Sequence, residues 1–486
     1  MNKPLRRVSI FCGLLVLALL ARVNWVQFVQ ADELKTDDKN RRVSIARYAQ
    51  PRGNIIVDGK PITGSAKTDT GDFKYKRTYK EGPMWAPVTG YASQAFGANQ
   101  LEKLNDGILS GDDDRLFFNR TIDMMTGKPK KGGNVVTTLN AKAQKAAFDG
   151  LRGKKGAVAA LDPKTGAILA LASTPSYDPS SFAGNTDKDS KAWAGLQKDK
   201  NEDDPMLNRA LKQTYPPGST FKVVTSAAAL ESGEYDLDKG TDSPDPYRLP
   251  DSTTDLGNDG NHPCKNASLR VALQWSCNTV FAKVSNQLGN EKMKEMAGKF
   301  GFDDPEVDTP VRAAESRYPK DNKPQNAMAG IGQASVTASP LQMAMVASAV
   351  ANDGKLMKPY MVDQLVAPNL NVVEQHKPQT YGEPVSSENA QKLQQMMETV
   401  VSDGTGTTGA IPGVTVGGKT GTAQHGENNT KNPYAWFISY AKTDDGSPVA
   451  VAVVVESSDV ARSEIAGSKL AAPIAKNVMQ AVLRDK

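Results

Sequence analysis

Five short stretches of the chain, one of them the alternating run of apolar positions at residues 434–441, predict five β-strands. Two of them, residues 157–161 and 167–173, flank the turn sequence at residues 162–166 and therefore predict a hairpin. The other three lie near the C-terminus, at residues 413–422, 434–441 and 449–455, the last two joined across a turn at residues 444–446. The five strands bracket a helical middle.

Apolar positions spaced three and four residues apart predict the helices. They occur at residues 269–275, at residues 341–351 directly after Pro340, and at residues 472–484 in the tail, which we expect to pack on the sheet. Residues 223–230 are small and apolar, which predicts a further, buried helix.

The chain divides into two parts of different character. Residues 41–150 are polar and rich in turns, and they contain no dense cluster of reactive side chains. A stretch bounded by glycines at residues 150–156 separates them from the predicted strands and helices. We therefore predict an N-terminal non-catalytic module over residues 32–150 and a larger domain over residues 151–486.

An apolar segment at residues 8–29 follows three basic residues at the N-terminus. As a helix it would be about 33 Å long, enough to cross the hydrocarbon core of a bilayer. It predicts an uncleaved anchor, with residues 1–7 in the cytoplasm and the rest of the chain outside. The alternative is a cleaved signal peptide, for which residues 29–31 offer a small-residue cleavage site.

Composition limits the classes of function. The 486 residues carry 59 Lys and Arg against 54 Asp and Glu, and the net charge of +5 gives no nucleic-acid footprint. None of the three histidines belongs to a metal-ligand spacing, so neither a metal nor a cofactor is expected. Export would place Cys264 and Cys277 in an oxidising compartment, either paired or as two free buried thiols.

Ser219 lies at the approach to the predicted buried helix. Two prolines and Gly218 precede it, so Ser219 falls at or near the N-cap, where unpaired N–H groups and the positive end of the helix dipole gather. Lys222 lies one turn further on the same face, where its amine can approach the Ser219 hydroxyl. This spacing is typical of a base-activated nucleophile. The alternative is a serine cap followed by a surface lysine.

A Ser-X-X-Lys pattern is weak evidence alone, because it should occur by chance about twice in a chain of this length. A second match, Ser439 and Lys442, lies at the end of a predicted strand, where residues three apart point to opposite faces. We interpret this second match as coincidence.

Two further motifs follow in chain order. Ser276, Cys277 and Asn278 come directly after the predicted helix at residues 269–275, and Lys-Thr-Gly-Thr at residues 419–422 lies on the first late strand. The order Ser-X-X-Lys, Ser-X-Asn, Lys-Thr-Gly is the motif set of penicillin-recognising enzymes. The chain thus resembles the class B penicillin-binding proteins, most closely their actinobacterial penicillin-binding protein A branch.

The resemblance covers nearly the whole chain and includes Arg52 and Gly53, residues 161–166, residues 331–333 and residues 340–344. It implies an α/β fold of the α+β type, with a five-stranded antiparallel sheet flanked by helices. The domain over residues 151–486 would be the transpeptidase domain. Residues 32–150 would form a smaller pedestal or dimerisation-like module, joined to one transmembrane helix.

The resemblance also implies a function: a peptidoglycan D,D-transpeptidase that cross-links stem peptides ending in D-Ala-D-Ala through a serine acyl-enzyme and is inhibited covalently by β-lactams. Its expected place is the cytoplasmic membrane, with the catalytic domain outside, in cell division or septal wall synthesis. The expected partners are a polytopic membrane glycosyltransferase and other division proteins. The alternatives are a division scaffold or a β-lactam sensor with a vestigial active site.

Roles for the site residues follow from the resemblance. Ser219 is expected to be the acylated nucleophile, Lys222 the general base, and Ser276 the relay of a proton to the leaving amine. The backbone N–H groups of Ser219 and Thr422 would form the oxyanion hole. The expected substrate-binding residues are Asn278, Lys419, Thr420, Gly421 and Thr422.

Cys277 stands inside the second motif, and we expect it to form a disulfide with Cys264. A loop this short would contribute about 3 kcal/mol by the chain-entropy model. The bond would also tether the loop that carries Ser276 and Asn278.

Class A β-lactamases deacylate with a glutamate in an acidic-X-X-Leu-Asn pattern that lies between the second and third motifs. Here Asp204, Leu207 and Asn208 match this pattern but precede Ser219, in the wrong chain order. We therefore expect a long-lived acyl-enzyme with penicillin, because no base is placed to activate water.

Overall fold

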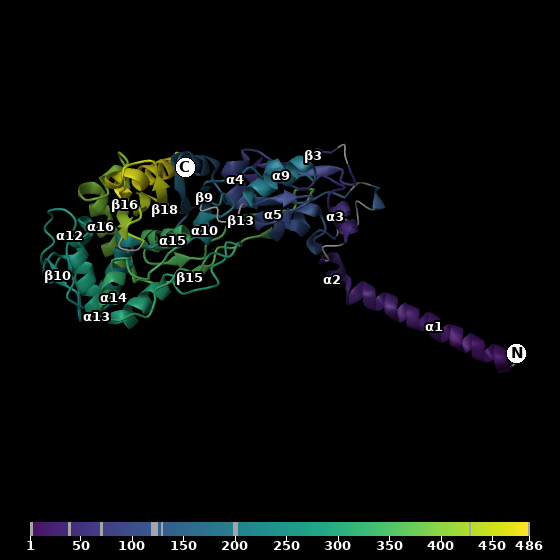
Figure 1. Ribbon diagram of the computed structural model, residues 1–486, viewed down its shortest axis with the longest axis horizontal. Coiled ribbons are helices and arrows are strands. Elements are labelled where there is room, and N and C mark those ends of the chain that lie inside the picture. The colour runs from purple at the N-terminus through teal and green to yellow at the C-terminus, as the bar shows by residue number, and fades with distance from the viewer. Residues whose placement is uncertain are drawn as a thin grey trace.

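The computed structural model describes residues 3–36, 40–68, 71–117, 125–127, 130–197, 203–426 and 429–484. The protein is elongated, with the N-terminal helix projecting from one end and the late strands lying toward the other (Figure 1). The N-terminal module lies between them.

The projecting helix α1 (Lys3–Phe28) contains the predicted apolar segment. None of its residues is buried against the rest of the protein. Its 26 residues span about 39 Å, which exceeds the roughly 30 Å hydrocarbon core of a bilayer. Among the described residues, it is the one helix long and apolar enough to cross a membrane.

The sheet of the C-terminal region has five antiparallel strands in the order β16, β17, β18, β8, β9. Their bounds are β8 Lys154–Leu161, β9 Ile168–Thr174, β16 Thr415–Ala423, β17 Tyr434–Thr443 and β18 Gly446–Ser458. All five predicted strands are confirmed. Pairing between β18 and β8 joins the late strands to the early hairpin.

Helices cover both faces of this sheet. The predicted tail helix, α17 (Ala472–Leu483), packs with α8 (Ala141–Gly150) on one face. The helices α11 (Lys222–Glu231) and α15 (Pro340–Ala351) belong to the core on the other face. Every residue of α15 is buried.

Successive side chains of the central strand β18 point to opposite faces of the sheet and so pack in different cores. Ala450, Ala452 and Val454 pack in the core that contains α15, whereas the intervening Val451 and Val453 pack in the core that contains α17. Because both of its faces are covered, this strand is almost continuously apolar.

The N-terminal module contains a second five-stranded sheet, with strand order β14, β13, β7, β1, β2. The bounds are β1 Ile55–Val57, β2 Lys60–Pro61, β7 Asn134–Thr137, β13 Val362–Val366 and β14 Val372–Gln375. Strands β13 and β14 come from late in the chain, yet β13 pairs with β7. The late part of the chain therefore contributes two strands to the sheet of the N-terminal module. A single boundary near residue 150 would assign β13 and β14 to the other domain.

A buried ion network holds the segment around Arg52 in this module. The Arg52 and Arg77 Nε atoms lie 2.7 and 2.6 Å from the two carboxylate oxygens of Glu102. Burial acts to raise the pKa of Glu102, but Arg77 and Arg52 outweigh it and lower the pKa. A Cβ on the neighbouring Gly53 would lie 1.7 Å from the Gly133 carbonyl oxygen, so only glycine fits there.

The remaining elements connect these layers. The helices are α2 Ala31–Thr36, α3 Arg41–Arg47, α4 Gly82–Thr89, α5 Gln100–Leu104, α6 Asp106–Ser110, α9 Asp187–Leu196, α10 Arg209–Lys212, α12 Leu269–Gln274, α13 Asn278–Lys299, α14 Lys323–Ala329 and α16 Ser387–Asp403. The single turns are η1 Asp114–Leu116, η2 Pro179–Phe182, η3 Gly218–Phe221, η4 Thr407–Gly409, η6 Arg462–Glu464 and η7 Gly467–Ala471. The short strands are β3 Thr63–Lys67, β4 Tyr75–Tyr79, β5 Ala92–Ser93, β6 Gly97–Ala98, β10 Tyr247–Arg248, β11 Asp255–Leu256, β12 Leu356–Met357 and β15 Thr380–Gly382.

Candidate active site

Ser219 lies in η3, a single 3₁₀ turn that leads directly into α11. The sequence analysis placed Ser219 at or near the N-cap of the buried helix. The structure instead has Pro217 at the N-cap of η3, and Lys222 is the first residue of α11. The N-cap residue of α11 is Phe221, so Ser219 lies near that cap and not at it, because the chain enters the helix through this tighter turn. Ser219 is partly exposed, whereas Thr220 and Phe221 are buried.

Backbone contacts fix the Ser219 turn against its neighbours. Gly218 has a φ of 53°, and its N–H donates to the Gly332 carbonyl at 2.9 Å. The Trp436 indole of β17 donates to the Pro216 carbonyl at 3.0 Å. A Cβ added to Gly218 would lie 3.1 Å from the Ala423 side chain at the end of β16. The turn is thereby seated against the sheet.

Lys222 is fully buried, and it joins this turn to the second motif. Its Nζ lies 2.7 Å from the Ser276 carbonyl oxygen, 2.7 Å from Asn278 Oδ1 and 3.2 Å from Ser276 Oγ. In the described part of the chain, none of its hydrogen bonds goes to the Ser219 hydroxyl. Burial, reinforced by the nearby charge of Lys419, lowers the pKa of Lys222 far below its ordinary value, so the neutral amine is favoured.

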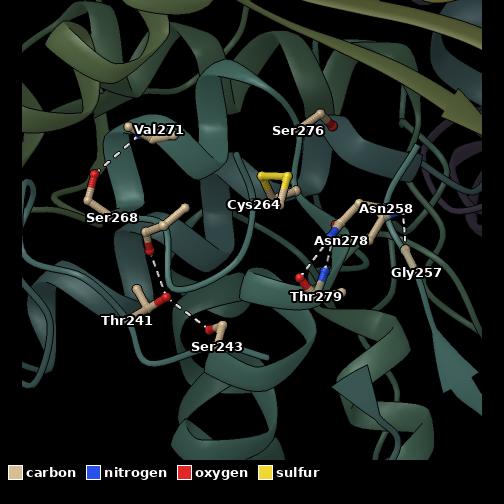
Figure 2. The surroundings of a disulfide bond; sticks show 12 residues. Thr241, Ser243, Gly257, Asn258, Cys264, Ser268, Val271, Ser276, Asn278 and Thr279 are labelled. Atoms are coloured by element: carbon tan, nitrogen blue, oxygen red, sulfur yellow. Dashed lines mark hydrogen bonds between the residues drawn. A yellow bond between two sulfur atoms is a disulfide. The ribbon is translucent and has the colours of Figure 1, made fainter. Parts of the chain in front are cut away.

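The second motif bridges two helices. Ser276 follows α12 and has a φ of 59°, a left-handed conformation that costs a non-glycine residue about 1–2 kcal/mol. Cys277 is the N-cap residue of α13, and Asn278 is its first residue. The structure joins Cys277 to Cys264 in a disulfide, with 5.5 Å between the Cα atoms (Figure 2). Ser276 is thus held in its strained conformation by α12 before it and by the disulfide of Cys277 after it.

The third motif lies on β16, at the end of the five-stranded sheet. Lys419 is fully buried, and its Nζ donates to the Thr420 carbonyl at 2.9 Å. Burial lowers the pKa of Lys419 to about 7. A Cβ at Gly421 would lie 3.0 Å from the Thr220 methyl and 3.1 Å from the Pro217 carbonyl oxygen. Glycine therefore lets this strand approach the Ser219 turn, while Thr422 beside it is only partly buried.

The second motif and β16 are linked by a residue that sequence reasoning missed. Thr405, just after α16, has its hydroxyl 2.8 Å from the Thr420 hydroxyl, and its N–H donates to the Gln274 carbonyl at 3.2 Å. Gln274 in turn donates to the Asp403 carbonyl at 2.7 Å. No local pattern marks Thr405, because its partners are far away in the sequence.

The alternative sequence matches do not form sites. Ser439 is buried on β17, and the Lys442 amine donates instead to Gln394 Oε1 at 3.0 Å. In the acidic-X-X-Leu-Asn match, the buried Asn208 donates to the Pro87 carbonyl at 2.7 Å and the Asp204 carbonyl accepts from Arg209. The residues of both matches therefore take part in local contacts.

Comparison with known proteins identifies both regions. Residues 156–480 match the penicillin binding protein transpeptidase domain, and residues 52–135 match the penicillin binding protein A dimerisation domain. The chain is 40% identical to the peptidoglycan D,D-transpeptidase PbpA of Mycolicibacterium smegmatis and to that of Mycobacterium tuberculosis, with both chains covered completely in each comparison.

Solved structures agree with these matches. The ceftriaxone acyl-enzyme of penicillin-binding protein A from M. tuberculosis superposes with a TM-score of 0.85 at 40% identity, covering 90% of this chain and 100% of that one. The penicillin G acyl-enzyme of the same protein gives a TM-score of 0.82 at 40% identity, with 89% and 100% covered. The chain therefore belongs to the class B penicillin-binding proteins, a family of serine-type D,D-transpeptidases.

Proposed function

We propose that this protein cross-links peptidoglycan stem peptides during cell division, with Ser219 as its nucleophile. One observation carries the assignment of the site: the buried Lys222 amine, one turn after Ser219, contacts both Ser276 and Asn278. Two segments distant in sequence, the Ser219 turn and the second motif, thus meet at one amine. The M. tuberculosis penicillin-binding protein A, solved as acyl-enzymes with ceftriaxone and penicillin G, supports the same chemistry.

The first step would be acylation. Ser219 Oγ attacks the carbonyl carbon of the penultimate D-Ala while the neutral Lys222 amine takes its proton. The backbone N–H groups of Ser219 and Thr422 would stabilise the negative charge on the tetrahedral oxygen. The intermediate then collapses, the terminal D-Ala departs as an amine, and an ester on Ser219 remains.

Ser276 would return the proton to the departing amine. A neutral lysine amine has two N–H bonds, and these are matched by the Ser276 carbonyl oxygen and Asn278 Oδ1. Once the amine has taken the Ser219 proton, its third N–H can donate to Ser276 Oγ 3.2 Å away. This arrangement gives the proton a route from Lys222 through Ser276 Oγ to the leaving nitrogen.

Substrate binding would use the edge of β16. A peptide that ends in a carboxylate suits a donor-rich, cationic strand edge, where Lys419, Thr420 and Thr422 would hold the carboxylate and Gly421 permits close approach. Asn278 would hold the substrate backbone. β-Lactams would occupy the same edge and acylate Ser219.

The second step would be transfer to an amine. The neutral acceptor amine of a neighbouring stem peptide attacks the ester carbonyl carbon and loses a proton to Lys222, an amide bond forms, and the protonated Lys222 returns the proton to Ser219 Oγ as the ester bond breaks. Water would compete poorly, because it needs a base to activate it. The segment of Asp204 and Asn208, which matches the deacylating pattern of β-lactamases, is engaged in packing contacts instead.

The membrane setting is part of the proposal. Helix α1 would anchor the chain in the cytoplasmic membrane, with both extracytoplasmic regions beyond it and the N-terminal module between the membrane and the catalytic domain. A polytopic membrane glycosyltransferase and other division proteins would be its partners.

Complementation tests this function. In a strain depleted of the native protein, Ser219→Ala should restore neither peptide cross-linking nor division, while Ser439→Ala, which changes the serine of the chance match, should restore both. If Ser219→Ala restores division without restoring cross-links, the protein is a scaffold and the proposed catalytic role in division is wrong.

A further inference from the structure

The segment at residues 257–264 is fastened to the second motif near both of its ends. At one end, Asn258 Oδ1 accepts the Thr279 N–H at 3.1 Å, and Asn258 Nδ2 donates to Thr279 Oγ1 at 3.0 Å (Figure 2). Asn278 Nδ2 also approaches the Gly257 carbonyl, at 3.4 Å. At the other end, Cys264 is bonded to Cys277.

A third contact stiffens the same segment. The His262 ring stacks on Trp275, with 4.3 Å between centroids and 14° between planes. Trp275 directly precedes Ser276, so the segment touches the second motif from both sides. The residues between the fasteners are therefore held beside the motif.

Asp259 lies between these fasteners with an exposed side chain. In the described ranges its carboxylate forms no hydrogen bond or ion pair, so its charge is available to a ligand. Its chain neighbour Asn258 is hydrogen-bonded to Thr279, and Thr279 follows Asn278, whose Oδ1 lies 2.7 Å from the Lys222 amine. Burial, and then Lys419, lower the pKa of that amine, and the charge of Asp259 opposes them. Asp259 thus presents an unpaired negative charge near the reacting amine.

This charge has opposite effects on the two substrates of a transpeptidase. The donor peptide and β-lactams each bring a carboxylate to Lys419, and a nearby Asp would repel them. The acceptor brings an amine, which is an ammonium in water, and a nearby Asp would attract it. The carboxylate therefore favours the acceptor.

We propose that Asp259 is a specificity-determining residue for the acceptor: its carboxylate binds the ammonium of the incoming stem peptide beside the second motif. The inference rests on the proposed transpeptidase function and deepens it. It predicts that the acyl-enzyme prefers cationic amines over neutral nucleophiles.

Partition of the acyl-enzyme tests this inference. Full-length protein in detergent is acylated with a thioester analogue of the donor peptide, and the acyl group is transferred to water, to the ε-amine of Nα-acetyl-lysine amide, or to hydroxylamine, which is uncharged at neutral pH. The ratio of amide product to hydrolysis product is measured for each nucleophile. The variants are Asp259→Asn and the control Asp251→Asn, which removes a charge from a neighbouring loop position whose carboxylate pairs with Lys323 at 3.7 Å.

Asp259→Asn should lower the ratio for the lysine amine by about threefold, the size expected for one exposed ion pair, and leave the ratio for hydroxylamine unchanged. High salt should remove the difference between the variant and the wild type. Asp251→Asn should behave as the wild type.

An unchanged lysine ratio in Asp259→Asn, or an equal fall for both nucleophiles, would overturn the inference, the latter because it would indicate a purely structural role. A wild-type protein that is acylated but transfers to no amine would instead reject the transpeptidase function on which the inference rests.

Discussion

The two walls of the active-site cleft are held in place by different means. The wall that carries Ser219 consists of the η3 turn, α11 and β16, and its turn is held by hydrogen bonds to backbone carbonyls and by close glycine approaches. The wall that carries Ser276 is a left-handed residue between two helices, held by a disulfide and by the side chain of Asn258. Regular structure fixes the nucleophile, whereas side-chain tethers fix the proton relay.

Lys222 is the residue that connects the two walls. It belongs to α11 by its backbone and to the second motif by its hydrogen bonds. A change that moves the Ser276 wall should therefore shift the position of the Lys222 amine more than that of the Ser219 hydroxyl. Variants in each wall can thus be told apart by their effect on acylation.

The largest effect is expected for Lys222→Arg. A guanidinium stays protonated in a site that favours a neutral amine and therefore cannot accept a proton, so acylation by penicillin should slow by about 10³-fold or more. Stopped-flow acylation kinetics measure the change, and Lys442→Arg on β17 is the matched control. Near-normal acylation by Lys222→Arg would exclude the base role.

The pH dependence of acylation should be the next largest effect. Because burial lowers the pKa of Lys222, the rate should level off at a pH well below the ordinary lysine pKa. Below the folded pKa the rate should fall about tenfold per pH unit. A rate that still climbs tenfold per unit up to pH 10 would be inconsistent with a buried neutral base.

The variant Asp259→Asn should shift this pH–rate profile. Asp259 raises the pKa of Lys222, so removing its charge should move the acidic limb to lower pH.

The buried lysines also affect stability. Between the folded pKa and the ordinary lysine pKa, the unfolded chain binds more protons than the folded one, so the free energy of unfolding should rise with pH across that window. For Lys419 the window starts at about 7.

A smaller effect is expected when the disulfide is removed. Cys264→Ser with Cys277→Ser should lower the free energy of unfolding by about 3 kcal/mol and slow acylation several-fold, because the Ser276 wall loses its tether. Thermal unfolding and acylation are both measured, with Cys12→Ser in α1 as the control. Unchanged acylation with reduced stability would show that the tether does not position the relay.

The smallest effect should come from Thr405→Val. This change removes the hydroxyl contact with Thr420 and should cost about 1 kcal/mol, with acylation slowed by less than tenfold. Thr399→Val on α16, whose hydroxyl bonds only within its own helix, is the control. Equal behaviour of the two variants would mean that the link between the walls is dispensable.

Short apolar stretches and helical periodicity were sufficient to predict the strands of the catalytic sheet and its main helices, because those elements are buried. The motifs identified the family because each keeps its spacing within a few consecutive residues. Neither signal could reveal Thr405 or Asn258, whose partners lie far along the chain, nor that β13 and β14 complete the N-terminal sheet. The shift of the Ser219 turn was equally hidden, because propensity does not separate a 3₁₀ entry turn from the first turn of an α-helix.

The most direct test of the account is to locate the penicillin adduct. Full-length protein is incubated with penicillin G, digested and analysed by mass spectrometry, with turnover followed through the ring absorbance. The account predicts one equivalent of acyl group on Ser219 that persists for many minutes and is absent in Ser219→Ala. An adduct on another serine, or continued loss of penicillin beyond one equivalent of protein, would contradict it.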